Sequence, residues 1–187
     1  VVLSGGLLAK SGNESQQAEL ISGIIDGSKK ISFAYNESQA RFDLHNVATK
    51  AEKNDQGYVI NGNKSLVLHG VSADLLIVSV RTSGESLDTD GITLLLVPAN
   101  AEGVSIKATR TLDGQRAAEV QFTNVQVNGE AILGEEGGAA SVIDQIADEA
   151  MLALCAEAVG SMEKLYKDTV AYTKERKQFG VAISGFQ

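Results

Sequence analysis

The chain has 187 residues, of which 43% are hydrophobic and 21% are charged, and this composition is typical of one or two ordinary folded domains. Its net charge of −8 argues against nucleic acids and anionic membranes as partners. Its apolar runs, such as residues 92–97, are far shorter than the roughly 20 residues that a membrane-spanning helix needs. The single cysteine, Cys155, cannot form an intramolecular disulfide, so we expect a reducing, cytoplasmic location.

Residues 1–32 have helical character. After Ser15, apolar side chains recur at close to a 3.6-residue period, at Ala18, Leu20, Ile21, Ile24 and Ile25. Asn13 or Ser15 could cap this helix, and Gly27 could end it. The segment is too short to form a domain by itself.

From residue 31 to about 127 the pattern changes to short strands separated by turn residues. The dipeptide Asn61-Gly62 lies between two apolar runs and predicts a β-hairpin, because both residues tolerate the backbone of a tight turn. The expected strands are 57–60, 64–68, 75–81, 92–97, 104–110, 118–122 and 125–127. Closely spaced strands without intervening helices predict antiparallel pairing in a barrel or sandwich.

A long helix is expected from Ala139 to Arg176, since this stretch lacks proline and has only Gly160 as an internal glycine. Such a helix would be roughly 55 Å long. It cannot bury its own apolar positions, so more chain or a partner must cover them. The sequence starts without methionine and stops directly after a helix-ending signal, and we expect both ends to be cuts through a longer protein.

The end of this helix reads Tyr172-Thr-Lys-Glu-Arg176-Lys-Gln-Phe179-Gly180, with Gln187 soon after. It resembles the signature of acyl-CoA dehydrogenases, in which a helix closes with R-K-x-F-G and the next opens near a glutamine. Further segments resemble the family in the same order: Gly12-Asn-Glu-Ser-Gln-Gln, Gly57-Tyr-Val-Ile-Asn-Gly-Asn-Lys, and Leu112-Asp-Gly-Gln-Arg116. The ordered matches cover essentially the whole chain.

This resemblance implies an α+β multidomain fold. Residues 1–32 would end an N-terminal helical domain, residues 33–132 would form a middle β domain, and residues 138–187 would begin a C-terminal helical bundle. It also implies FAD as cofactor, α,β-dehydrogenation of an acyl-CoA thioester in fatty acid or lipid metabolism, and a homo-oligomer or a heteromer with a related chain. The residues then expected to contact the FAD of a neighbouring subunit are Arg176, Gln178, Phe179 and Gln187.

The segment expected beside this chain's own flavin departs from the family pattern. The family has T-E-P-x-A-G-S-D where this chain has Asn36-Glu-Ser-Gln-Ala-Arg-Phe-Asp43, so Arg41 and Phe42 replace two small residues. The family has W-I-T where this chain has Leu66-Val-Leu68, which favours ordinary strand positions. Glu149 lies one residue from the position where some members carry the catalytic glutamate, and that step rotates a helical side chain by about 100°. A solvated acidic face is the simpler interpretation of Glu149.

Three functions therefore stay open. The first is a working FAD-dependent acyl-CoA dehydrogenase. The second is a non-catalytic partner subunit, which donates the four cross-subunit residues but has lost its own flavin pocket, at Asn36, Phe42, Leu66 and Leu68. The third, an unrelated β domain with a helical dimerisation arm, explains the strands and the helix but not the ordered motifs. His45 and His69 have no second ligand at metal-binding spacing, so no metal site is expected.

Overall fold

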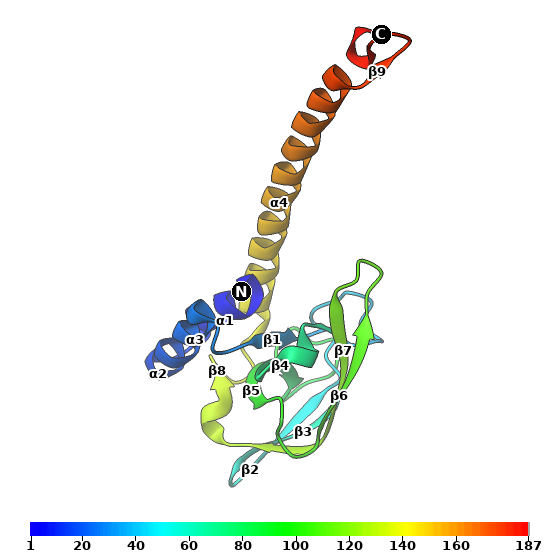
Figure 1. Cartoon of the computed structure of the whole chain (residues 1–187). Coiled ribbons are helices and arrows are strands. Elements are labelled where there is room, and N and C mark those ends of the chain that lie inside the picture. The colour runs from blue at the N-terminus through cyan, green and yellow to red at the C-terminus, as the bar shows by residue number, and fades with distance from the viewer. Residues whose placement is uncertain (187) are drawn as a thin grey trace. The chain divides into compact units, whose positions relative to one another are not determined.

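The computed structural model describes residues 1–186, which form two compact units, Val1–Ala147 and a second unit that begins at Asp148. The first unit holds a helical segment, an eight-stranded sheet and the start of a long helix (Figure 1). The second unit holds the remainder of that helix and a small two-stranded sheet. The α+β fold class expected from the sequence is confirmed.

The N-terminal segment consists of helix α1 (Val2–Ser11), helix α2 (Glu14–Gln16), the π-helical turn η1 (Gln17–Ile21) and helix α3 (Ser22–Asp26). Of the two caps considered, Asn13 is the one used. Its side-chain oxygen accepts a hydrogen bond from Gln16 N at 2.9 Å, and Gln16 Oε1 accepts one from Asn13 N at 3.1 Å. This reciprocal capping box satisfies two backbone donors at the start of α2. The segment ends as expected at Gly27, whose φ of +79° is left-handed.

The strands of the large sheet follow the order β6-β7-β3-β2-β4-β5-β8, with β1 paired to β4 off this path. Their bounds are β1 Ile31–Ala34, β2 Lys50–Asn54, β3 Gly57–Leu68, β4 Leu75–Arg81, β5 Ile92–Pro98, β6 Val104–Arg110, β7 Arg116–Val127 and β8 Ile132–Leu133. The expectation of antiparallel pairing throughout is wrong, because β1 and β2 both run parallel to β4. A hairpin inserted between β1 and β4 returns the chain in the same direction, so the sheet is mixed.

The predicted hairpin at Asn61-Gly62 is wrong as well. Strand β3 runs unbroken through both residues, and the turn lies earlier, between Asn54 and Gly57 of the β2–β3 hairpin. Gly62 instead marks a register shift in the pairing of β3 with β7. A Cβ atom at Gly62 would lie only 2.7 Å from the Cα of Thr49, so the glycine serves close backbone approach rather than a turn.

Strand β4 separates two apolar cores, because alternate side chains of a strand point to opposite faces. Leu76, Val78 and Val80 join the first core cluster, which the inner faces of β3, β5 and β7 complete. Ile77 joins the second cluster, where α1, β1, β5 and the first turns of helix α4 meet. Each leucine-sized side chain buried in this way stabilises the fold by about 1.5–3 kcal/mol. The polar Ser79 and Arg81 share the face of Ile77 and are buried too.

Helix α4 (Ala140–Glu175) matches the expected long helix to within one residue at each end. Its first turns bury Ala140, Ile143 and Ile146 in the first unit. Beyond Ala147 its large apolar side chains are exposed, among them Met151, Leu152, Leu154, Val159, Met162, Leu165, Tyr166 and Tyr172. Among residues 1–186, no helix combines the length and apolar character needed to cross a membrane.

Replacing Gly57 with alanine is expected to destabilise the fold by about 1–3 kcal/mol, measured by denaturant unfolding. Gly57 has a φ of +132°, and an added Cβ would overlap the Val127 carbonyl oxygen of the paired strand β7. The matched control is Gly129→Ala, where an added Cβ has no atom within 4 Å. Equal stability of the two variants would contradict this account of the β2–β3 turn.

Candidate functional site

The segment from Asn36 to Asp43 forms two successive turns after strand β1. Ala40 N donates to Glu37 O at 3.0 Å, and Asp43 N donates to Ala40 O at 2.9 Å. The turns place Arg41 and Phe42 in left-handed backbone, with φ values of +48° and +73°, and leave the Phe42 side chain 85% exposed. We call residues 36–43 the flavin-side turn, after the role that the sequence predicts for it.

A distortion of strand β3 lies beside this turn. Ser65 N donates to Asn36 O at 2.8 Å, and the Asn36 side-chain amide donates to Ser65 Oγ at 3.1 Å. The register of β3 against β7 shifts between Lys64 and Val67, and Leu66 within this bulge has a φ of +50°. The expectation that Leu66 is an ordinary strand residue is therefore wrong, because the bulge turns its backbone out of the strand conformation.

Most of the strained backbone of the first unit lies in the flavin-side turn and at the end of strand β3. Among residues 1–186, six non-glycine residues have left-handed backbone. Four of them lie in the turn, on the last residues of β3 or directly after that strand: Arg41, Phe42, Leu66 and His69. Such backbone costs on the order of 1–3 kcal/mol per residue and persists where the surroundings enforce it, often at binding sites. Leu66 and Leu68 are also partly exposed, at 43% and 39%. The turn and bulge thus present a strained surface with exposed apolar side chains.

A buried ion pair lies under this surface. Lys64 Nζ, fully buried, donates to Glu37 Oε1 at 2.6 Å and to Ser79 Oγ at 3.0 Å. The Glu37 carboxylate also accepts the backbone N–H groups of Ala48 and Thr49, at 2.9 and 3.1 Å. The sequence analysis missed Lys64, although the alternation of Tyr58, Ile60 and Lys64 along β3 places all three on one buried face.

Burial shifts the pKa of both members of the pair. Burial lowers the pKa of Lys64 to about 8, against the attraction of Glu37. For Glu37, burial alone would raise the pKa, but the Lys64 ammonium and the hydrogen bonds donated to the carboxylate together hold the pKa below its ordinary value of 4.5. Both groups are therefore ionised near neutral pH.

This lowered pKa predicts how Glu37 affects acid stability. Because the unfolded state binds the proton more readily than the folded state, the stability that Glu37 contributes is present above pH 4.5 and is lost as the pH falls through the lower folded pKa. We expect denaturant unfolding of Glu37→Gln to vary less with pH over this range than unfolding of the unchanged protein. Glu102→Gln removes an exposed carboxylate and should follow the unchanged protein. A pH dependence retained in full by Glu37→Gln would contradict the assignment.

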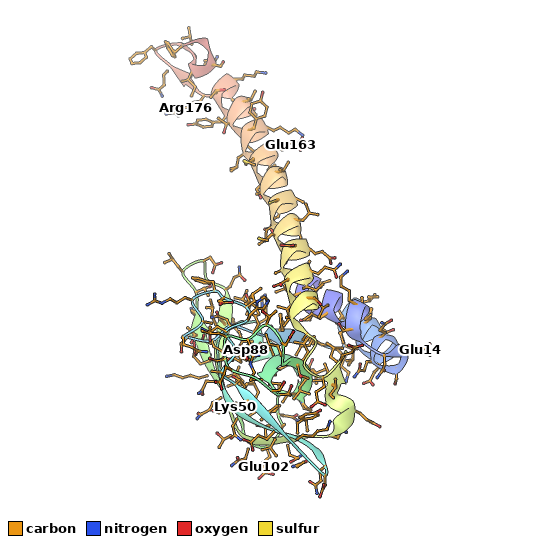
Figure 2. All side chains as sticks on the ribbon, turned by 180° about the vertical axis from the view of Figure 1, so that it is seen from behind. Glu14, Lys50, Asp88, Glu102, Glu163 and Arg176 are labelled. Atoms are coloured by element: carbon orange, nitrogen blue, oxygen red, sulfur yellow. The ribbon has the colours of Figure 1, made fainter. Side chains whose placement is uncertain are left out.

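Arg81 joins two loops of the first unit. It is buried, and its guanidinium donates to five backbone carbonyls at 2.7–3.4 Å, those of His45, Val47, Ser86, Asp88 and Asp90. Figure 2 labels Asp88 in the loop between β4 and β5 that Arg81 holds. Arg81 closes the predicted strand 75–81, and alternation places it on the buried face of Ile77 and Ser79, a signal that the sequence analysis did not use.

The residues predicted to contact a neighbouring subunit's cofactor follow directly on helix α4, where Figure 2 labels Arg176. Strands β9 (Lys177–Gln178) and β10 (Val181–Ala182) form a tight hairpin with Phe179 at φ +50° and 96% exposed. Phe179 packs edge-on against Phe186, with ring centroids 6.4 Å apart. Arg176 and Gln178 are exposed as well. Gln187 lies outside the described residues.

The remaining candidates are scattered. Glu149 is an exposed residue of α4 in the second unit. His45 Nε2 lies 3.0 Å from Asp144 Oδ1 in the first unit. Within the part of the chain that the structure describes, no three residues of the metal-binding types His, Cys, Asp and Glu are grouped to hold a metal ion. The backbone N–H of His45 donates to Asp43 Oδ1 at 3.0 Å, so His45 contacts the end of the flavin-side turn.

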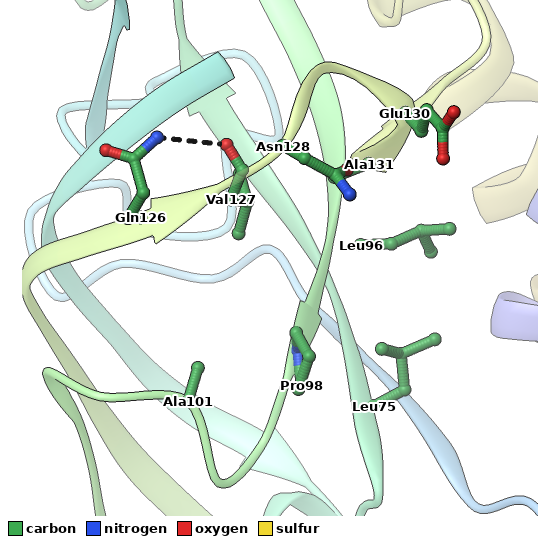
Figure 3. Close-up of a pocket in the computed structure, with 9 residues that line it drawn as sticks. All are labelled: Leu75, Leu96, Pro98, Ala101, Gln126, Val127, Asn128, Glu130 and Ala131. Atoms are coloured by element: carbon green, nitrogen blue, oxygen red, sulfur yellow. Dashed lines mark hydrogen bonds between the residues drawn. The ribbon is translucent and has the colours of Figure 1, made fainter. Parts of the chain in front are cut away.

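A pocket opens elsewhere in the first unit, at the ends of strands β4, β5 and β7 (Figure 3). Gln126 Nε2 donates to Val127 O at 3.2 Å on its rim. Its lining is Leu75, Leu96, Pro98, Ala101, Gln126, Val127, Asn128, Glu130 and Ala131. Glu130 is the one ionisable residue of that lining, so the pocket offers no acid–base pair. The lining includes none of the cofactor-binding or catalytic residues predicted from the sequence.

A comparison with known protein families identifies the fold. Residues 32–125 match the model of the acyl-CoA dehydrogenase middle domain, half of the chain. The chain belongs to the acyl-CoA dehydrogenase family. The resemblance seen in the sequence motifs is thereby confirmed.

Curated relatives and solved structures agree with this membership. The chain is 31% identical over 180 residues to the short-chain specific acyl-CoA dehydrogenase of Megasphaera elsdenii, covering 94% of this chain and 47% of the relative. It is 33% identical over 183 residues to the mitochondrial isovaleryl-CoA dehydrogenase of Oryza sativa subsp. japonica, covering 96% and 44%. The structure of butyryl-CoA dehydrogenase from Megasphaera elsdenii matches with a TM-score of 0.92 and 30% identity, over 100% of this chain and 50% of that one. The chain thus spans about half the length of the relatives it matches.

Proposed function

We propose that the chain is part of an FAD-dependent acyl-CoA dehydrogenase that catalyses α,β-dehydrogenation of an acyl-CoA thioester. One observation carries the proposal beyond family membership. Arg41 stands where the family motif has glycine, yet its backbone is left-handed, with a φ of +48°. The flavin-side turn therefore keeps a backbone that glycine adopts without strain, although the side chain has changed.

Some of the exposed side chains at the end of α4 and at the flavin-side turn have the chemistry needed to bind FAD, and others do not. At the end of α4, the exposed guanidinium of Arg176 offers paired donors that suit phosphate oxygens, and Phe179 offers an exposed ring. At the flavin-side turn, Phe42, Leu66 and Leu68 offer apolar contacts, but no side-chain hydroxyl stands at these positions. The cross-subunit set thus retains the family chemistry more fully than the chain's own turn.

The bound cofactor would supply acceptance of the hydride from the substrate β carbon. The chain's own residues would bind and orient it: Arg176 and Gln178 through polar contacts with a neighbouring subunit's dinucleotide, and the flavin-side turn through its backbone. The base that removes the α proton is not assigned to a described residue, and Glu149 stays a candidate only. Exposed apolar side chains of α4 beyond Ala147 support an assembly in which further chain or a related subunit covers them.

A second candidate function is a non-catalytic partner subunit in a heteromer with a related acyl-CoA dehydrogenase chain. The observation that favours it is Phe42, a bulky ring in left-handed backbone where the family motif has serine. Such a subunit would donate Arg176, Gln178, Phe179 and Gln187 to the site of a catalytic sister chain. Its own pocket would stay without flavin.

Restoring small residues in the turn separates the two candidates. If the native turn already holds flavin, the double variant Arg41→Gly/Phe42→Ser of the full-length protein should bind FAD with an affinity within about threefold of that of the unchanged protein. A change from no measurable flavin to stoichiometric flavin would instead support the partner-subunit function. Flavin fluorescence during titration of the protein freed of cofactor measures both outcomes. Arg110→Gly/Leu112→Ser changes an exposed segment outside the turn and serves as the matched control.

A further inference from the structure

The Lys64–Glu37 ion pair joins both ends of one loop. Lys64 Nζ donates to Tyr35 O at 3.3 Å, just before the flavin-side turn, and to the Glu37 carboxylate within it. The same carboxylate accepts the backbone N–H groups of Ala48 and Thr49, where the loop enters strand β2. Residues 35–49 are therefore closed by a clamp whose centre is a single carboxylate.

This clamp is a poor device for stability alone. Removing two charges from water is expensive, and well-packed apolar residues of similar volume often stabilise a protein as much as a buried ion pair does. An apolar pair could not, however, accept two backbone N–H groups at one end of the loop and donate to a backbone carbonyl at the other. The ion pair therefore fixes the backbone conformation of the loop at both of its ends.

The strained backbone of the turn points to the same conclusion. Arg41 and Phe42 hold left-handed backbone between the two clamped ends, at Glu37 and Ala48. Left-handed backbone at non-glycine residues persists only where the surroundings enforce it. The ion pair holds this loop at Glu37, Ala48 and Thr49. Arg81 holds it as well, by donating to His45 O and Val47 O.

We propose that Lys64 and Glu37 are positioning residues, which act through the loop they close to hold the flavin-side turn in its binding conformation. This inference rests on the proposed function for the identity of the ligand, FAD, but its geometry can be tested without the ligand. Neither residue touches the flavin in this account. Their effect reaches the ligand through the backbone of Asn36, Arg41 and Phe42.

The test uses the full-length protein and two readouts. The first is amide hydrogen exchange of peptides covering residues 36–49, compared with peptides from strands β4 and β5. The second is FAD bound per protomer. We expect Glu37→Gln to speed exchange in residues 36–49 by about tenfold while β4 and β5 change by less than about twofold, and to lower flavin occupancy. Lys64→Arg keeps the charge and the donors and should restore part of the protection that Lys64→Met loses.

Two further variants keep the test decisive. Ser79→Ala removes one contact of Lys64 without leaving a charge unpaired, and it replaces Glu37→Gln in the test if that variant does not fold. Ser79→Ala should speed exchange of the same peptides by a smaller factor. The double variant Lys53→Met/Glu136→Gln removes an exposed ion pair of 2.7 Å and should leave exchange of residues 36–49 unchanged. Exchange that rises equally in β4, β5 and the loop, or in none of them, would overturn the positioning role. An unchanged protein that binds no FAD would refute the proposed function and leave the exchange result to decide the positioning role alone.

Discussion

Replacing Arg81 with methionine is expected to lower the free energy of unfolding by about 3–5 kcal/mol. The substitution keeps an unbranched apolar stem but removes the guanidinium, which leaves five backbone carbonyls of two loops without their charged donor. A buried carbonyl that loses its donor incurs the full free-energy cost of its removal from water. A hydrogen bond to a charged group also contributes more to stability than one between neutral groups. Denaturant unfolding of the first unit measures the change.

The matched control for Arg81 is Arg110→Met, which makes the same substitution at an exposed end of strand β6. We expect Arg110→Met to change stability by less than about 0.5 kcal/mol. Loops held by Arg81 should also become more sensitive to proteolysis, at residues 43–49 and 82–91. A loss below about 1 kcal/mol for Arg81→Met would show that water or other groups satisfy the carbonyls, and it would contradict the role given to Arg81.

Replacing Arg176 with alanine in the assembled full-length protein is expected to weaken FAD binding by about 10- to 100-fold, without a comparable loss of stability. The expectation rests on the proposed contact of Arg176 with the dinucleotide of a neighbouring subunit. The exposed position of Arg176 means that its removal leaves no buried partner unpaired within this chain. Titration of the cofactor-freed protein with FAD, followed by flavin fluorescence, measures the affinity.

Lys174→Ala is the matched control, since it removes the same charge from the last turn of α4 two residues away. A general loss of positive charge at the helix end would weaken FAD binding in both variants alike. A specific guanidinium contact would weaken it in Arg176→Ala alone. Equal affinities of both variants and the unchanged protein would contradict the proposed cross-subunit contact.

Much of the fold follows from local sequence signals. The apolar period of residues 18–25, the capping residue Asn13 and the stop at Gly27 agree with the helical segment. The long helix is predicted almost to the residue, because the stretch from Ala140 to Glu175 has no proline and only one glycine, Gly160. The parallel pairing of β1 and β2 with β4 could not be predicted, because it depends on the order of strands in the sheet. A second failure arises where glycine has more than one use. Gly62 looks like a turn residue, yet it permits the close approach of Thr49 within a continuous strand.

The candidate site residues stay predictions, and the sequence carries less information about their surroundings than about the fold. The turn that contains Arg41 and Phe42 could be located by its resemblance to the family motif. Strand alternation could have placed Lys64 on the buried face of β3, but it could not identify Glu37 as the partner of Lys64. Only the folded chain brings Lys64 Nζ within 2.6 Å of Glu37 Oε1, a residue 27 positions away in the sequence. Long-range charge pairing of this kind leaves no local periodic signal.

The most direct test of the account is the flavin content of the full-length protein. FAD absorbance near ~450 nm, divided by protein concentration, gives the number of flavins per protomer, measured for the protein alone and together with a related chain from the same source. The account predicts about one FAD per protomer for the protein alone. About one FAD per pair, found only with the related chain, would transfer the account to the partner-subunit function. No flavin under either condition would contradict the proposed function.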